Sequence, residues 1–430
     1  MKLQLPLCAR VLSNGLTVVV SENHEMPVFG LCVAYRIGSR LEPRNRTGFA
    51  HLFEHLMFEG TPRAPKGVFD RVCEASGGSN NGQTRPDVTL YVGTAPAGAL
   101  DRFLWLEADR MTALALSADT LANQREVVKE EIRVNVRNDP YGLFEYSEIP
   151  QATFEKWENA HDGYGDFVDL DAATLDDVSS FFAAYYRPNN AVLAVAGDVR
   201  AEALFDEAAR LFEAIPCAPL PLRPDLNESK RPSAIVGVSK ASLANTPALA
   251  AGWRMPPRHH PDVWPLIVLG ELLHEGRAAR LYRGLVEARE IATDVAGGFN
   301  PFQGWAWYEG TTLFLSRIAY RRGVPANAVL AALEEEIGRI GHRDVPEEEL
   351  SRVKTRMLSN LYASLESRLD LAVELAQATV FDGTPDGLLG LSERIEAVTP
   401  EDLRRAAGWL SPEARAVVVK QPAGEAAAED

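Results

Sequence analysis

Two histidines and a glutamate stand close together early in the chain, in the order His51, Glu54, His55. Apolar residues recur at helical spacing across residues 47–58, so this segment is expected to form a helix. On a helix, positions four apart lie on one face, and both imidazoles can therefore bind the same metal ion. Glu54 stands beside the second histidine, where its carboxylate can take a proton from a water that the metal activates. The pattern indicates zinc-dependent attack of water on a peptide carbonyl.

A catalytic zinc site takes three protein ligands and keeps one position open, and the motif itself supplies only two. The alternative interpretation is a helix whose two histidines make ordinary polar contacts and bind no metal. The other histidines show no spacing that would complete the site. We expect all six to be surface or packing residues: His24, His161, His259, His260, His274 and His342.

The segment HLFEHLMFEGT resembles the inverted zinc motif of the pitrilysin family, the inverzincins, which include insulin-degrading enzyme and the mitochondrial processing peptidase. The resemblance implies a third zinc ligand, a glutamate on a downstream helix 76 residues after the second histidine, which is Glu131. The surrounding REVVKEEIRVNVRNDP is also similar to the family. Glu130 is the neighbouring candidate, but it points about 100° away on the same helix.

A second segment of the resemblance is GGSNNGQT, residues 77–84, which is similar to the family's GG-x-x-N-A-x-T. It implies an edge strand that binds the substrate backbone by strand addition, with Asn81 near the scissile bond. Gly78, Ser79 and Asn80 would contact the substrate on the same strand. For Asn81 a plain turn is the alternative.

The chain departs from the family at the position seven residues before Glu131. Many members carry a second glutamate there, whereas this chain has Gln124. An amide at this position keeps hydrogen bonding to the ligand shell but loses the negative charge. We therefore expect Gln124 to be an outer-shell residue with a reduced electrostatic role.

The second departure concerns an arginine and a tyrosine, seven residues apart, that active members carry in the domain facing the zinc and that stabilise the oxyanion. Here Val286 and Thr293 occupy those positions. Nearby candidates stand at the wrong spacing and are expected to be surface or packing residues: Tyr282, Arg283 and Arg289. The resemblance therefore implies the zinc-bearing subunit of a heterodimer, whose related partner supplies the missing pair.

The order of expected elements recurs along the chain and indicates a duplicated α+β architecture. We expect a first domain over residues 1–215, a Pro-rich linker over 216–232, a second homologous domain over 233–422 and a disordered tail over 423–430. Each domain would be a mostly antiparallel sheet packed with helices. The resemblance implies that the two form a clam-like half-chamber, as in the roughly 50 kDa branch of the family that is similar to the mitochondrial processing peptidase.

Bulk composition excludes several classes of protein. The net charge of −16 argues against binding to nucleic acid. The four cysteines are far apart in sequence, which argues against a disulfide scaffold or a zinc finger and fits a reducing compartment. No apolar run is long enough to span a membrane, and the N-terminus lacks the pattern of a signal peptide. We expect a cytoplasmic protein, or a periplasmic one if a signal peptide has been removed.

The leading hypothesis is a zinc endopeptidase subunit that acts on peptides or unfolded precursors, with one zinc ion per chain. A structural subunit, like the core proteins of the respiratory bc1 complex, is the first alternative. An acidic peptide-binding or chaperone-like module with a vestigial metal is the second.

Overall fold

The computed structural model describes residues 3–231, 233–241, 243–343 and 345–422. The tail expected to be disordered, residues 423–430, lies outside the described residues. Contacts divide the chain into two units, each built from three segments. The first unit contains the chain up to Glu130, Gly163–Pro224 and Ser359–Glu393, and the second contains Glu131–Asp162, Asp225–Leu358 and the chain from Arg394 onward.

The first unit contains a six-stranded sheet in the order β1-β2-β6-β3-β5-β4. Its strands are β1 (Leu7–Val11), β2 (Thr17–Glu22), β3 (Val28–Tyr35), β4 (Ser79–Thr84), β5 (Thr89–Pro96) and β6 (Ala191–Gly197). Strands β2 and β6 are parallel, and all other neighbours are antiparallel. The central strand β6 is buried along its whole length, as its apolar sequence AVLAVAG predicts. Strand β4 forms one edge of this sheet.

The second unit repeats this topology with five strands in the order β7-β11-β8-β10-β9. They are β7 (Ile235–Ala241), β8 (Ala248–Met255), β9 (Ala292–Phe299), β10 (Thr312–Tyr320) and β11 (Arg415–Pro422). Here β7 and β11 form the parallel pair, and the remaining pairs are antiparallel. Strand by strand, this order matches β2-β6-β3-β5-β4 of the first sheet. The predicted duplication of a mostly antiparallel α+β unit is therefore confirmed.

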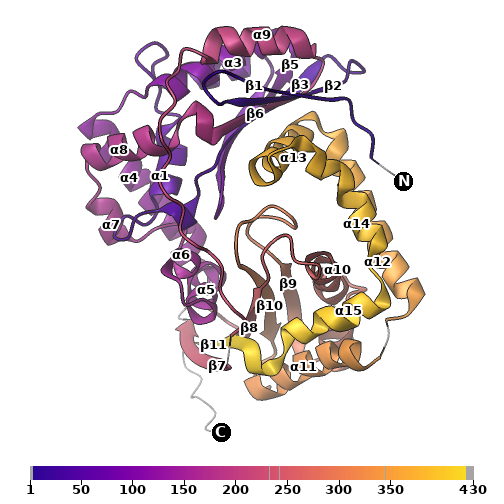
Figure 1. Ribbon diagram of the computed structural model, residues 1–430. Helices are drawn as coiled ribbons and strands as arrows, with labels where there is room; N and C mark the ends of the chain where they lie inside the picture. Colours follow the sequence, from indigo (N-terminus) through magenta and orange to yellow (C-terminus); the bar gives the residue numbers. More distant parts are fainter. Residues whose placement is uncertain (1–2, 232, 242, 344, 423–430) are drawn as a thin grey trace. The chain divides into compact units, whose positions relative to one another are not determined.

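Each sheet packs against helices that approach from different parts of the sequence. In the first unit, α3 and α9 lie on one side of the sheet and α13 on the other (Figure 1). In the second unit, α5 packs on β8 and β11. The helices of the first sequence half are α1 (Phe49–Leu56), α2 (Val68–Ala75), α3 (Leu100–Thr112), α4 (Ala118–Ile132), α5 (Ile149–Thr153), α6 (Trp157–Ala160), α7 (Phe167–Asp171), α8 (Leu175–Tyr185) and α9 (Ala201–Phe212). Those of the second half are α10 (Val263–His274), α11 (Ala326–His342), α12 (Glu347–Glu366), α13 (Arg368–Asp382), α14 (Leu391–Ala397) and α15 (Pro400–Ala407).

The spatial units differ from the sequential ranges 1–215 and 233–422 in two places. Helix α5 belongs to the second unit, and α13 belongs to the first. The physical reason is coverage of apolar surface, because a sheet that is buried on both faces needs helices on both. Each sheet thus receives one covering helix from the other half of the sequence.

The predicted linker, residues 216–232, contains no helix or strand among its described residues. It is nevertheless anchored in the second unit at one end. The Glu228 carboxylate accepts a hydrogen bond from Asn159 Nδ2 at 2.7 Å and pairs with the buried Arg254 guanidinium at 3.3 Å.

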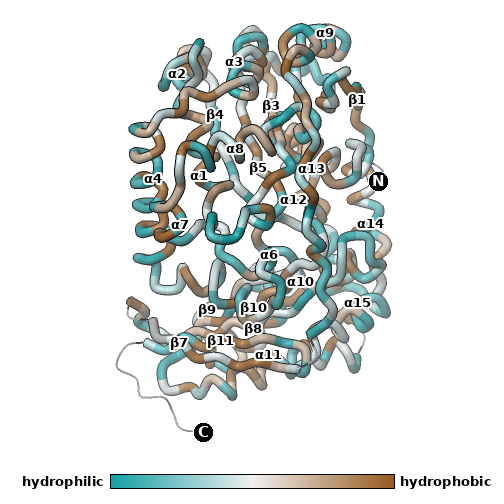
Figure 2. Tube along the Cα trace, turned by 60° about the vertical axis from the view of Figure 1, so that its left-hand side comes forward, coloured by the Kyte–Doolittle hydropathy of each residue, from teal (hydrophilic) through white to brown (hydrophobic). Residues whose placement is uncertain are grey.

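Surface helices carry the mixed pattern expected of a half-buried helix. Figure 2 shows hydrophobic and hydrophilic residues alternating along α4. Among the described residues, every helix is too short or too polar to cross a lipid bilayer.

At Gly30 on β3, the backbone of α13 lies close to the first sheet. A Cβ atom added at Gly30 would lie 2.2 Å from the carbonyl oxygen of Arg368 and 2.4 Å from the amide nitrogen of Leu369. Because both are backbone atoms, neither can move without moving the helix. We expect Gly30→Ala to lower the free energy of unfolding by about 1–3 kcal/mol, the range typical of overpacking.

Thermal unfolding followed by circular dichroism measures this effect. Gly98→Ala is the matched control, because a Cβ there meets no atom within 4 Å. A Gly30→Ala variant as stable as Gly98→Ala would show that α13 is not held against β3 in this way.

Candidate metal centre

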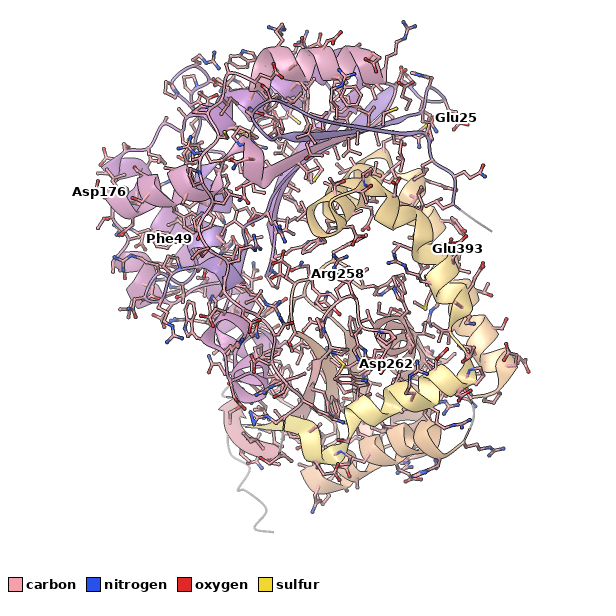
Figure 3. All side chains as sticks on the ribbon, in the orientation of Figure 1. Glu25, Phe49, Asp176, Arg258, Asp262 and Glu393 are labelled. Atoms are coloured by element: carbon pink, nitrogen blue, oxygen red, sulfur yellow. The ribbon has the colours of Figure 1, made fainter. Side chains whose placement is uncertain are left out.

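Helix α1 carries the HxxEH motif and begins without a capping side chain of its own. Gly48 precedes it with a φ of 81°, and the buried carboxylate of Glu42 accepts hydrogen bonds from the amides of Gly48 at 2.9 Å and Ala50 at 2.7 Å. A negative group at the start of a helix accepts hydrogen bonds from amides that have no partner within the helix, and it interacts favourably with the positive end of the helix dipole. Phe49, which opens α1, lies among the helices of the first unit (Figure 3) and packs on Phe181 with ring centroids 5.8 Å apart.

His51 and His55 face each other from successive turns of α1. Their Nε2 atoms lie 3.4 Å apart, and their rings meet edge to face with centroids 5.0 Å apart. His51 is buried, with 5% of its surface exposed, and its ring also contacts the ring of Tyr164 at 5.4 Å. Burial on one side and the aromatic neighbour restrict the orientations open to His51.

Glu131 joins the two histidines from the last turn of α4. One ligand atom each from His51, His55 and Glu131 all lie within 4.8 Å of one another. Contacts place the boundary between the units just after Glu130, but α4 runs unbroken to Ile132, so Glu131 is carried by a helix of the first unit. Glu130 is exposed and is not part of this cluster.

The spacing of the two imidazole nitrogens fits a tetrahedral metal ion. Two Zn–N bonds of about 2.0–2.1 Å that meet at the tetrahedral angle place their nitrogens about 3.3–3.4 Å apart. The observed Nε2–Nε2 distance is 3.4 Å. Two imidazoles and one carboxylate are also a donor set that catalytic zinc sites use, with a fourth position left for water. The residues present therefore fit a zinc ion.

Two protein-family models match the chain, each over a different range of residues. The family model described as "Insulinase (Peptidase family M16)" matches residues 17–156. The model described as "Peptidase M16 inactive domain" matches residues 172–357. The chain belongs to the M16 peptidase family. Its two-unit α+β fold matches the fold of this family. The three candidate metal ligands, His51, His55 and Glu131, lie within the residues matched by the insulinase model.

Individual M16 relatives span most of the chain. A zinc protease named PqqE from Helicobacter pylori is 29% identical over 372 residues, which cover 84% of this chain and 80% of that protein. The crystal structure of a protease from Helicobacter pylori is 27% identical, has a TM-score of 0.89 and covers 97% of this chain and 100% of that one. A structure of a peptidase M16 inactive domain from Pseudomonas fluorescens, 19% identical, shares the fold with a TM-score of 0.85, over 97% of this chain and 98% of that one.

Glu54 of this M16 chain lies on α1 between the two histidines and rests against β4. The contact forms at Gly82, where an added Cβ atom would lie 2.7 Å from Glu54 Cγ. Gly82 thus leaves the space that the half-buried Glu54 side chain fills. The carboxylate that we expect to act as a base therefore stands beside the edge strand that we expect to bind substrate.

The edge strand itself, β4, pairs with β5 alone among the described strands. The edge position predicted for GGSNNGQT is therefore confirmed. Ser79 and Asn81 are exposed, whereas Gly78 and Asn80 are half-buried. Asn80 Nδ2 donates to Asp70 at 3.2 Å, and the Asn81 side-chain oxygen accepts from the amide of Gly82 at 2.9 Å. Among the described strands none pairs with the outer side of β4, which is the position that strand addition uses.

Gln124 lies on α4, two turns before Glu131, with only 5% of its surface exposed. Its Nε2 donates to the Glu59 carboxylate at 2.6 Å, and Lys66 pairs with the same carboxylate at 2.5 Å. The sequence predicts that Gln124 is an outer-shell residue with a reduced electrostatic role, and in the structure its hydrogen-bond partner is Glu59, which the sequence did not single out. Glu59 was missed because a single charged residue after the motif has no recognisable pattern.

In the second unit, the two positions that lack the arginine and tyrosine of active members have ordinary surroundings. Val286 is half-buried in the helical turn Tyr282–Ala288, and exposed Thr293 on β9 donates to the carbonyl of Ala319 at 3.2 Å. Of the nearby candidates, Arg289 pairs with Glu335 at 2.7 Å, Arg283 is exposed, and Tyr282 lies beneath the guanidinium of Arg277 at 5.5 Å.

Three of the remaining histidines make contacts that explain them without a metal. His24 is exposed and lies 2.7 Å from Asp198, and His161 stacks on Trp157 with centroids 3.9 Å apart. His274 is buried between Ser316 and the carbonyl of Gly270, and burial lowers its pKa to about 4, so it is neutral at pH 7.

The adjacent carboxylates Glu130 and Glu131 allow a sharp test of the third ligand. Glu131→Gln should weaken zinc binding by more than the ~10–100-fold that changes to outer-shell partners typically cause, because it removes a charged ligand. Glu130→Gln removes the same charge one residue away and should leave zinc affinity unchanged. Competition with a chelator measures both dissociation constants. Equal affinities, or weaker binding by Glu130→Gln, would contradict the assignment of Glu131.

Proposed function

We propose that this chain is the zinc-bearing subunit of a metalloendopeptidase that hydrolyses peptides or unfolded precursors. The observation that carries the proposal is the convergence of His51, His55 and Glu131 at a nitrogen spacing that fits zinc, with Glu54 on α1 between the two histidines. Membership of the M16 family and relatives named zinc proteases support it. The chain would hold one zinc ion.

Some residues of the chain would bind the metal ion, and another would transfer the proton during hydrolysis. His51 and His55 would hold the ion through their Nε2 atoms, and Glu131 would add one negative charge. When bound, zinc supplies a Lewis acid that lowers the pKa of water towards ~7. Glu54 would accept the proton of the attacking water and pass it to the leaving amine nitrogen.

Substrate would bind along β4, next to Glu54. A peptide in extended conformation would add to the outer edge of the strand through backbone hydrogen bonds, which impose little side-chain specificity. Gly78, Ser79, Asn80 and Asn81 are the residues of this segment that would contact it. This mode suits unfolded chains, because a folded substrate does not offer a free extended backbone.

A second subunit is the remaining part of the proposal. The Val286 side chain has no hydrogen-bond donor, and the Thr293 hydroxyl already donates to the carbonyl of Ala319, so neither replaces the arginine or the tyrosine that would stabilise the developing oxyanion. We propose that a related chain supplies that pair and forms a heterodimer with this one. The alternative is a structural or peptide-binding subunit that holds zinc without catalysis.

Replacing the proposed base tests the reaction directly. In the complex with its co-purified partner, Glu54→Gln should lower kcat by about 10²–10⁴-fold, the range for loss of a general base. Bound zinc should remain at the wild-type level, because Glu54 is not a ligand. Hydrolysis of an internally quenched peptide measures the rate, and Glu130→Gln is the control. Unchanged activity of Glu54→Gln would rule out Glu54 as the base.

The isolated chain tests the need for a partner. Without the missing pair, the purified chain should bind zinc yet turn over peptides well below ~1 per second, the lower end of typical enzyme rates. Adding the related subunit should raise the rate. Turnover of ~1–10³ per second by the isolated chain would show that no partner is needed. Zinc and peptide binding without turnover, even with the partner, would favour the structural or peptide-binding alternative.

A further inference from the structure

Gln124 and Glu59 form a hydrogen bond between the two parts of the chain that carry the metal ligands. Glu59 lies four residues after His55, just beyond the end of α1. Gln124 lies on α4, seven residues before Glu131 and on the same face. Their bond of 2.6 Å has no part in the reaction proposed above.

The bond is protected from water. Gln124 is 5% exposed, and the Glu59 side chain is 9% exposed. The amide donates to a charged acceptor, and hydrogen bonds of this kind are shorter and stronger than neutral ones. A backbone bond next to it, from the amide of Ala115 to the carbonyl of Gly60 at 2.9 Å, ties the same loop to the segment that leads into α4.

Other side-chain contacts of α4 lead elsewhere. Lys129 pairs with Asp171 at 2.8 Å, and Arg125 donates to the carbonyl of Asp171, also at 2.8 Å. These contacts attach α4 to α7. The bond between Gln124 and Glu59 attaches the face of α4 that bears Glu131 to the loop that follows α1.

We propose that Gln124 and Glu59 are positioning residues that set the distance between Glu131 and the two histidines. The inference rests on the proposed metal site and concerns how that site is held. Carboxylates only accept hydrogen bonds, so a glutamate at 124 would place two negative groups about 2.6 Å apart in a buried site. Lys66 also pairs with the Glu59 carboxylate at 2.5 Å, and the contact with position 124 needs a hydrogen-bond donor there, which glutamine supplies and an ionised glutamate does not.

A swap of the two side chains provides the test. Gln124→Glu should weaken zinc binding by about 10–100-fold, as expected when support of a metal ligand is lost. The double variant Glu59→Gln with Gln124→Glu restores one amide and one carboxylate in reversed order and should recover most of this loss. Asn123→Asp is the matched control, because it adds the same charge to an exposed position one residue away and should bind zinc like wild type.

Zinc dissociation constants are measured by chelator competition, and metal-free unfolding temperatures are measured in parallel. A general stabilising role would lower the unfolding temperature of Gln124→Glu and leave the dissociation constant of the folded protein unchanged. That result, or a double variant as weak as Gln124→Glu, would overturn the positioning role. If the wild-type chain binds zinc, either of these results leaves the proposed function intact. A wild-type chain that binds no zinc would contradict both the proposed function and the positioning role.

Discussion

The two imidazole nitrogens of the candidate site lie 3.4 Å apart on one short helix, and the surrounding structure must hold that helix in place. A helix of eight residues is not stable alone in water, so α1 must be fixed by its neighbours. Aromatic packing does this on one side, where Phe53 lies 4.9 Å from Phe181 and 5.1 Å from Tyr186 between ring centroids. The Glu42 carboxylate fixes the start of the helix from outside it.

The two sheets likewise depend on packing by neighbouring elements. The first sheet offers β4 as an edge strand beside α1, while the inner strands β2, β6, β3 and β5 are largely buried. Burial of the second face is achieved by α13, which begins at Arg368, 171 residues after the last strand of that sheet ends at Gly197. In the second unit the corresponding contact is between α5 and Gly252 of β8, where an added Cβ atom would lie 2.5 Å from Thr153 Oγ1. The two units thus share the strand order and a close helix contact at a glycine of the matching strands β3 and β8.

The parts of this arrangement that sequence could predict are those with local or familial signals. Helical spacing predicted α1, and the resemblance predicted Glu131 on a downstream helix and the edge strand β4. The sequence of α13 does not show which sheet the helix covers. That depends on which sheet face is apolar and not yet covered by other helices. The bond between Gln124 and Glu59 was equally hidden, since polar partners 65 positions apart leave no periodicity in a single sequence. Long-range complementarity of this kind is set by the assembled fold.

The central claim is that His51, His55 and Glu131 hold one zinc ion in this chain. X-ray absorption at the zinc K-edge of the purified protein tests it most directly. The account predicts nitrogen and oxygen neighbours at about 2.0–2.1 Å, with outer-shell scattering from two imidazoles and no sulfur. Sulfur at about 2.3 Å, or a spectrum without imidazole scattering, would contradict it.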